Sequence, residues 1–240
     1  MPWDNIRLVG SETIAERTMA FHFTRPSGFD FRAGQAIDIT LIHPPETDSE
    51  GNTRGFSIAS PPFEDGLTVA TRMRDSALKR VLRNAHQGIE VKVEGPFGSL
   101  TLHKNAARPA VFLAGGIGIT PFVSIVRQAT KDKANHQLYL FYSNRRPEDA
   151  PFLDILRSAA QEHPNFHFVA TMTKMEASHQ TWTGETGKVD AGMLLRHVPD
   201  PLGPIYYIAG PPAMVAAMRQ MLLAAKVDED DVRTEEFSGY

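Results

Sequence analysis

The chain has 240 residues, of which 42% are apolar and 22% are charged, a composition typical of a folded globular protein. Its formal net charge of −3 provides no polycationic surface, so nucleic acid is not expected as a partner. The absence of cysteine excludes disulfides, a cysteine nucleophile and cysteine-ligated iron–sulfur clusters within this sequence.

No apolar run approaches the ~20 residues that a membrane-spanning helix needs. The first residues, MPWDNIRLVGSET, lack the basic region and following apolar stretch of a secretion signal. We therefore expect no membrane span and a cytoplasmic location. The length is sufficient for two domains of ordinary size.

Residues 1–105 have the pattern of short strands separated by turns. Apolar and polar residues alternate over four segments, as they do in half-buried strands; these segments are 20–23, 36–41, 67–70 and 89–93. Glycine and proline separate the segments, and one helix is expected over 77–84. The pattern predicts an antiparallel barrel or sandwich.

Residues 106–240 follow a different pattern, and the expected boundary lies near 104–109. The apolar run 110–114 is typical of a strand that is buried on both faces. Strands and helices then alternate: strands over 137–142, 166–171 and 205–209, and helices over 121–130, 151–162, 190–197 and 212–225. Alternation of this kind predicts βαβ units around a parallel sheet.

Glycine-rich segments follow two of these predicted strands. The first is GGIGITP, residues 115–121, in which Thr120 is expected to be the N-cap and Pro121 to occupy the first helical turn. The second is GPPAM, residues 210–214. Glycines let backbone N–H groups approach a phosphate, and ligands of open α/β sheets bind at the carboxyl ends of the strands. We therefore predict a dinucleotide site there, although an ordinary glycine-rich connection is the alternative at each place.

The first glycine segment departs from the G-x-G-x-x-G pattern because Pro121 occupies the last position. No acidic residue ends the second strand, where YSNRR (142–146) stands instead. The nine histidines show no metal-ligand spacing, so no metal site is expected.

The sequence resembles the ferredoxin–NADP reductase superfamily of flavoproteins over nearly its whole length. Three motifs carry the resemblance in order, namely RGFS (54–57), GGIGITP (115–121) and GPPAM (210–214). Weaker landmarks are FRAGQ (31–35), EGPFG (94–98) and EFSGY (236–240). The resemblance implies an N-terminal flavin-binding β-barrel, residues 1–105, and a C-terminal α/β domain for a nicotinamide coenzyme, residues 106–240.

The resemblance also implies roles for residues around the flavin. Arg54 would pair with a flavin phosphate, a task for which a planar fork of donors is suited. Gly55 and Phe56 would line the flavin, and Ser57 would donate a hydrogen bond near flavin N5. The candidates for catalysis are Ser57, Glu236 near it, and Tyr240, which would stack on the flavin. Without the family motifs, RGFS would read as a rim arginine, a core phenylalanine and a capping serine.

The helix expected at 77–84 would receive the flavin pyrophosphate, which favours FAD over FMN. The candidate residues at its start are Arg72, Ser76, Ala77 and Leu78. The candidates for NAD(P)H binding are Gly115, Gly116, Gly118, Thr120, Pro121, Ser143, Arg145, Lys174, Gly210, Pro211 and Met214. Both NADPH and NADH stay open as electron donors, and the missing acidic ribose partner favours NADPH.

Three features depart from the family pattern. Phe56 replaces the commoner tyrosine, Ala209 stands where many relatives have cysteine, and no four-cysteine cluster module is present in the sequence. The first removes a hydroxyl from the flavin site, and the second removes a thiol from the expected position of the nicotinamide.

The sequence therefore predicts an NAD(P)H-dependent FAD oxidoreductase. It would pass electrons to a ferredoxin, a flavodoxin, an oxygenase cluster protein or free flavin. A redox protein could dock on a basic surface formed by Arg72, Arg74, Lys79, Arg80 and Arg83. Two alternatives are a flavin-holding electron-transfer or redox-sensing subunit without NAD(P)H turnover, and a flavin-free dehydrogenase that uses the second half alone.

Overall fold

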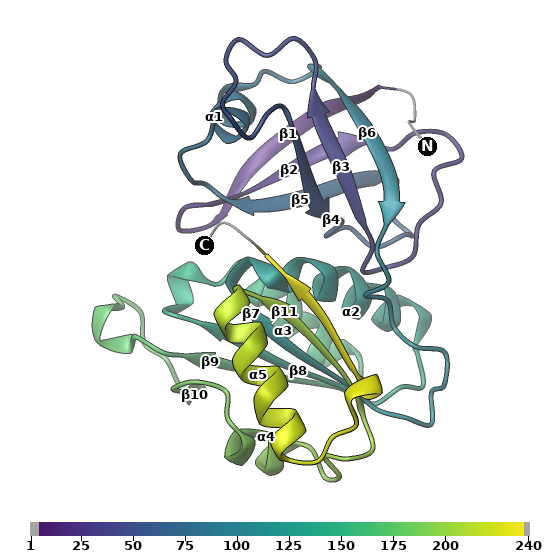
Figure 1. Cartoon of the computed structure of the whole chain (residues 1–240), viewed down its shortest axis with the longest axis vertical. Coiled ribbons are helices and arrows are strands. Elements are labelled where there is room, and N and C mark those ends of the chain that lie inside the picture. Colours follow the sequence, from purple (N-terminus) through teal and green to yellow (C-terminus); the bar gives the residue numbers. More distant parts are fainter. Residues whose placement is uncertain (1–4, 238–240) are drawn as a thin grey trace.

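The computed structural model describes residues 5–237, which form two layered units stacked along the long axis (Figure 1). The first unit is an antiparallel sheet of order β4-β3-β6-β1-β2-β5. Its strands are β1 (Ile6–Ala15), β2 (Thr18–Thr24), β3 (Ala36–Leu41), β4 (Thr53–Ser57), β5 (Gly66–Arg72) and β6 (Glu90–Phe97). An antiparallel bridge between Ile58 and Val69 joins the two edges of the sheet and closes it into a barrel.

The barrel forms because its strands alternate between apolar and polar side chains. In β3 every second residue is buried, and Ile37 and Ile39 lie in the interior with Phe21 and Phe23 of β2. Helix α1 (Ala77–Asn84) follows β5 and packs Leu78 and Leu82 against the same core.

The second unit is a parallel sheet of order β10-β9-β8-β7-β11-β12. Its strands are β7 (Ala110–Gly115), β8 (Leu138–Asn144), β9 (Phe166–Met172), β10 (Glu185–Thr186), β11 (Ile205–Gly210) and β12 (Val232–Glu236). Its helices are α2 (Thr120–Asp132), α3 (Leu153–Glu162), α4 (Ala191–His197) and α5 (Pro212–Ala224). Short 3₁₀ helices are η1 (Gly116–Ile119), η2 (Pro147–Asp149), η3 (Met175–Ala177) and η4 (Glu229–Asp231).

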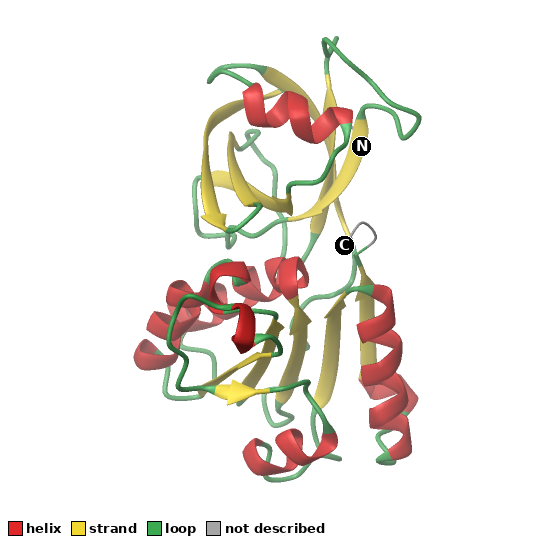
Figure 2. Cartoon of the chain, turned by 90° about the vertical axis from the view of Figure 1, so that its left-hand side faces the viewer, coloured by secondary structure: helices red, strands yellow, loops and turns green. Residues whose placement is uncertain are grey.

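The central strand β7 is buried throughout because helices cover both faces of the sheet (Figure 2). Phe112 of β7 packs with α2 and α3 on one face. Val111 and Leu113 pack with α4 and α5 on the other. The predicted fold class, a barrel followed by an α/β unit with a parallel sheet, is confirmed.

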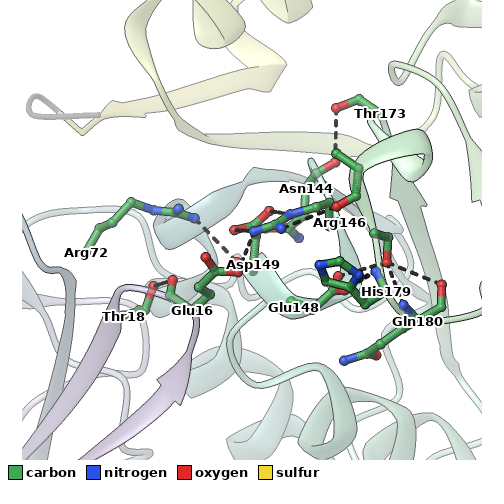
Figure 3. A network of polar contacts seen from close by, with 12 residues as sticks. Glu16, Thr18, Arg72, Asn144, Arg146, Glu148, Asp149, Thr173, His179 and Gln180 are labelled. Carbon is green, nitrogen blue, oxygen red and sulfur yellow. Dashed lines mark hydrogen bonds and ion pairs between the residues drawn. The ribbon is translucent and has the colours of Figure 1, made fainter.

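Polar contacts fix the two units against each other (Figure 3). Arg146 Nη2 donates to Glu16 Oε2 at 2.5 Å, and the Glu16 N–H donates to the Glu148 carbonyl at 2.8 Å. Arg72 Nη2 reaches the Asp149 carbonyl at 3.3 Å. The connection between β6 and β7 contains the expected domain boundary. Within residues 5–237, no helix has both the length and the apolar character needed to cross a membrane.

Candidate functional site

Two adjoining clefts lie where the barrel meets the carboxyl edge of the parallel sheet. The barrel cleft has a volume of about 710 Å³, and its lining includes Arg54 and Ser57. The glycine-loop cleft has a volume of about 410 Å³, and its lining includes Gly116. Arg72 and Arg74 line both clefts, so a single elongated ligand or two ligands in contact could span them.

The barrel cleft contains most of the residues predicted for the flavin. Those that line it are Arg54, Gly55, Phe56, Ser57, Arg72 and Ser76. Ala77 and Leu78 do not line the cleft; both are buried at the start of α1. Ile117 and Phe237 of the α/β unit also line the cleft, so both units contribute to it.

Both terminal nitrogens of Arg54 are hydrogen-bonded within the chain. Its Nη1 donates to the carbonyls of Glu50, Gly51 and Thr53 at 2.8, 3.2 and 2.7 Å. Its Nη2 donates to Glu50 Oε2 at 2.6 Å and reaches Asp48 Oδ1 at 3.5 Å. The anion facing Arg54 in this structure is therefore a pair of carboxylates.

The start of α1 is capped from outside the helix. Ser76 is the N-cap residue, but its side chain makes no capping hydrogen bond. Asp48 Oδ2 instead accepts the Ala77 N–H at 2.7 Å, and this bond lowers the pKa of Asp48. Among residues 5–237, Ser76 Oγ and Arg72 Nε are buried atoms without a hydrogen-bond partner.

A carboxyl lies beside Ser57, as predicted, but it belongs to Glu235. Ser57 Oγ donates to Glu235 Oε1 at 3.3 Å, and burial raises the pKa of Glu235. The placement of Glu236 near Ser57 is wrong, because neighbouring residues of a strand point to opposite faces. Glu236 is exposed and faces α5 across a groove that includes Val215 and Arg219.

An aromatic ring from the end of the described chain does reach the cleft. Phe237 lines it, and its N–H donates to the Gly210 carbonyl at 2.9 Å. Tyr240, the residue predicted to stack on the flavin, lies outside the described residues.

Two cations of the expected basic docking surface, Lys79 and Arg80, bind other groups of the chain. Arg80 binds Glu46, with its Nη2 2.6 Å from Oε2, and also pairs with Asp75. Lys79 donates to the Arg72 carbonyl at 2.7 Å and lines the barrel cleft. Burial lowers the pKa of Lys79 to about 8.

The glycine loop forms one wall of the second cleft. Gly116 has a φ of 51°, which favours glycine, and it lines the cleft together with Gly115. A Cβ on Gly115 would lie 2.3 Å from Met214 Sδ and 3.0 Å from Pro211 Cδ, so a side chain there would require Met214 and Pro211 to shift. Glycine at these positions permits a ligand to approach the main chain closely.

Two residues of the loop have structural roles that differ from the expectation. A Cβ on Gly118 would lie 2.4 Å from the Ala209 carbonyl oxygen, so this glycine permits close packing of η1 against β11. Thr120 is not the N-cap: α2 begins at Thr120, the cap position is Ile119, and the Thr120 hydroxyl donates to the Ile117 carbonyl at 3.0 Å. The reason is the 3₁₀ turn η1, which supplies the helical backbone before Thr120.

The remaining predicted coenzyme residues divide into two groups. Those that line the glycine-loop cleft are Gly115, Gly116, Ser143, Arg145, Pro211 and Met214. Those that do not line it are Gly118, Thr120, Pro121, Lys174 and Gly210. Thr120 and Pro121 are buried in the core, and Lys174 is exposed.

Two polar residues of this cleft, Arg17 and Asn144, were not predicted from the sequence. Arg17, from the turn between β1 and β2, places a cation from the barrel opposite the glycine loop. Thr173 and Asn144 line it at the ends of β9 and β8. Asn144 is 6% exposed, and both polar atoms of its amide lack a partner in the part of the chain that the structure describes. Asn144 stood within the YSNRR segment, but nothing in the pattern indicated which of these side chains turns inward.

Known proteins are similar to this chain in sequence and in fold. The family described as oxidoreductase NAD-binding domain matches residues 112–220. The glycine betaine monooxygenase reductase subunit of Chromohalobacter salexigens is 30% identical over 97% of this chain and 64% of that protein. The phenol hydroxylase P5 protein of Acinetobacter pittii is 27% identical over 87% of this chain and 58% of that protein.

Solved structures share the fold at lower identity. The Amycolatopsis cytochrome P450 reductase GcoB gives a TM-score of 0.83 at 22% identity, over 99% of this chain and 70% of that one. A ferredoxin NADP⁺ reductase from Neisseria gonorrhoeae, solved with FAD and NADP, gives 0.78 at 22% identity over 97% of each chain.

The fold consists of a β-barrel followed by an α/β unit, with the paired clefts between them. The chain is similar to the oxidoreductase NAD-binding domain family over residues 112–220 and shares the two-domain fold of the solved reductases named above. It spans about three fifths of the length of the curated relatives named here.

Proposed function

We propose that the chain is an NAD(P)H-dependent flavoprotein reductase. Residues 1–105 would bind FAD, and residues 106–240 would bind the coenzyme. The observation that carries the proposal is the adjoining pair of clefts, which share Arg72 and Arg74. One cleft holds the RGFS residues and the other lies over the glycine loop, so a flavin and a nicotinamide could meet between them.

The residues of the barrel cleft fit a flavin phosphate. Its cations are Arg54, Arg72, Arg74 and Lys79. Ser76 Oγ and Arg72 Nε have hydrogen-bonding capacity to spare among the described residues. A pyrophosphate would use this extended set of donors more fully than a single phosphate would, which favours FAD over FMN.

A bound flavin would supply the hydride acceptor, N5, which no side chain of the protein can replace. The chain's own contribution is orientation and proton storage. Phe56 and Phe237 line the cleft with apolar surface. Ser57 Oγ is held by Glu235, and the raised pKa of Glu235 lets this carboxyl keep a proton closer to neutral pH than an ordinary glutamate does.

The glycine-loop cleft favours NADPH over NADH. Arg17, Arg72, Arg74 and Arg145 line it, and no acidic residue is among the described residues that do so. An additional phosphate on the ribose is attracted by such a cationic surface, whereas NAD-specific sites use a carboxylate for the ribose hydroxyl.

The acceptor that we propose is a redox protein, such as a component of an oxygenase system. The support comes from the relatives, whose names describe reductase subunits or components of monooxygenases and dioxygenases. The cytoplasmic location expected from the sequence stays a prediction.

Anaerobic mixing of the FAD-loaded chain with each coenzyme tests the proposal. We expect NADPH to bleach the visible flavin absorbance faster than NADH does. Flavin that is bound but bleached by neither coenzyme would contradict the proposal and favour a flavin-holding subunit. The substitution Arg145→Ala should raise the KM for NADPH more than that for NADH, whereas Lys174→Ala, outside the cleft, is the matched control.

A further inference from the structure

The loop between β3 and β4 places carboxylates on the groups that a flavin phosphate needs. We call residues 46–51 the acidic loop. Glu46 binds Arg80, Asp48 caps α1 through Ala77, and Glu50 binds Arg54. Each carboxylate of the loop therefore forms an ion pair with a cation or accepts a hydrogen bond from a helix N–H.

Asp48 and Glu50 both contact Arg54, which lines the barrel cleft. Asp48 bridges the start of α1 and the guanidinium of Arg54, with its Oδ2 2.7 Å from Ala77 N and its Oδ1 3.5 Å from Arg54 Nη2. Glu50 Oε2 is 2.6 Å from the same Nη2, and Glu50 lines the cleft. A carboxylate and a phosphate are both oxyanions, so they compete for these donors.

The third carboxylate differs from the other two. Glu46 binds Arg80, and neither of these residues lines the cleft, whereas Asp48 and Glu50 both contact Arg54, which does. The acidic loop therefore contains its own control position, in which an ion pair of similar geometry lies away from the ligand.

We propose that Asp48 and Glu50 are internal competitors for the flavin phosphate, which must displace them from Arg54 and the start of α1 to bind. This inference rests on the proposed function of the barrel cleft as a flavin site. The competitors weaken binding of flavins that carry phosphate and leave binding of the isoalloxazine ring unchanged. A site whose hydrogen-bond donors already bind carboxylates of the same chain holds its ligand less tightly than a site with free donors. The reason is that displacing the carboxylates costs part of the binding free energy.

The test is a titration of the flavin-depleted chain with FAD, FMN and riboflavin, followed by flavin fluorescence. Asp48→Asn keeps an oxygen that caps α1 but removes the charge. Glu50→Gln leaves the contact with Ala77 untouched. We expect each substitution to lower the dissociation constants of FAD and FMN by about two- to fivefold, the range of a partly exposed charge pair. The dissociation constant of riboflavin should not change, and the control Glu46→Gln should alter none of the three.

Equal tightening of riboflavin and FAD, or an unchanged FAD-to-riboflavin ratio in Glu50→Gln, would overturn the inference while leaving the flavin site intact. Failure of the wild-type chain to bind any of the three flavins would instead contradict the proposed function and this inference with it. Urea unfolding of each variant identifies any loss of α1, and Glu50→Gln decides the outcome if Asp48→Asn is destabilised.

Discussion

Replacement of Gly118 by alanine tests whether the glycine loop is held by direct packing against β11. A Cβ at this position would lie 2.4 Å from the Ala209 carbonyl oxygen, 2.5 Å from the Ala209 carbonyl carbon and 2.6 Å from the Gly210 nitrogen. All three atoms belong to the main chain of the parallel sheet, so no rotation of a side chain can relieve the overlap.

The loop and the end of β11 must therefore move apart. Overpacking of this kind costs about 1–3 kcal/mol in the free energy of unfolding. For a chain of 240 residues this corresponds to a decrease in Tm of about 2–12 °C. Because Gly116 belongs to the same loop and lines the glycine-loop cleft, we also expect a higher KM for the coenzyme.

Thermal unfolding of Gly118→Ala is to be compared with that of Gly10→Ala. A Cβ on Gly10 would have its nearest non-neighbouring atom, Gln87 Nε2, at 3.9 Å. Equal Tm values for the two variants would refute the packing argument. A decrease in Tm with an unchanged KM for the coenzyme would refute the link between this packing and the glycine-loop cleft.

Three further predictions concern charged groups. Burial raises the pKa of Glu235 above 4.5, so the contribution of Glu235 to stability is present below pH 4.5 and is lost as pH rises through the raised pKa. Glu235→Gln should flatten this part of the Tm–pH profile. An unaltered profile would contradict the assignment of the pH dependence to Glu235. Because the pKa of Lys79 is about 8, the affinity for FAD should fall as pH rises through 8. Lys79→Met should remove this fall in affinity. A fall of the same size in the variant would exclude Lys79 as its source. Arg108 donates two hydrogen bonds of 2.8 and 2.7 Å to Asp231. Urea unfolding of Arg108→Ala should therefore show a decrease of about 1–3 kcal/mol in the free energy of unfolding. A smaller decrease would mean that hydrogen bonds to solvent replace the ion pair.

Local patterns in the sequence were sufficient for most of the fold. Helix α1 spans 77–84 as predicted, because its apolar residues recur at helical spacing before a turn. The alternation of strands and helices after residue 105 likewise predicted the parallel sheet. These features depend on burial along a short segment, which the sequence displays directly.

Two strands that were not predicted, β1 and β12, form because they pair with a neighbouring strand and not because of their own sequence pattern. Strand β12 reads VRTEE, is mostly polar, and pairs at the edge of the sheet with β11 alone. Most of β1 after Leu8 is not buried, and its register with β2 contains two irregularities. Neither segment has the alternation that marks a half-buried strand.

The site was predictable where a motif lies on one element and not where distant segments meet. RGFS lies on β4, and four of its residues line the barrel cleft. The contact of Asp48 with Ala77 joins residues 29 positions apart, through a loop whose path no local pattern determines. Glu236 was predicted beside Ser57 and Glu235 is found there for the same reason, because the register of β12 is set by its pairing with β11.

The central claim is that hydride passes from a nicotinamide coenzyme in the glycine-loop cleft to a flavin in the adjoining barrel cleft. The most direct measurement is anaerobic single-turnover bleaching of bound FAD by NADPH, compared with NADPH that carries deuterium at the reacting carbon. The claim predicts bleaching in both cases and a slower rate with the deuterated coenzyme. Complete absence of bleaching with NADPH and NADH alike would contradict it.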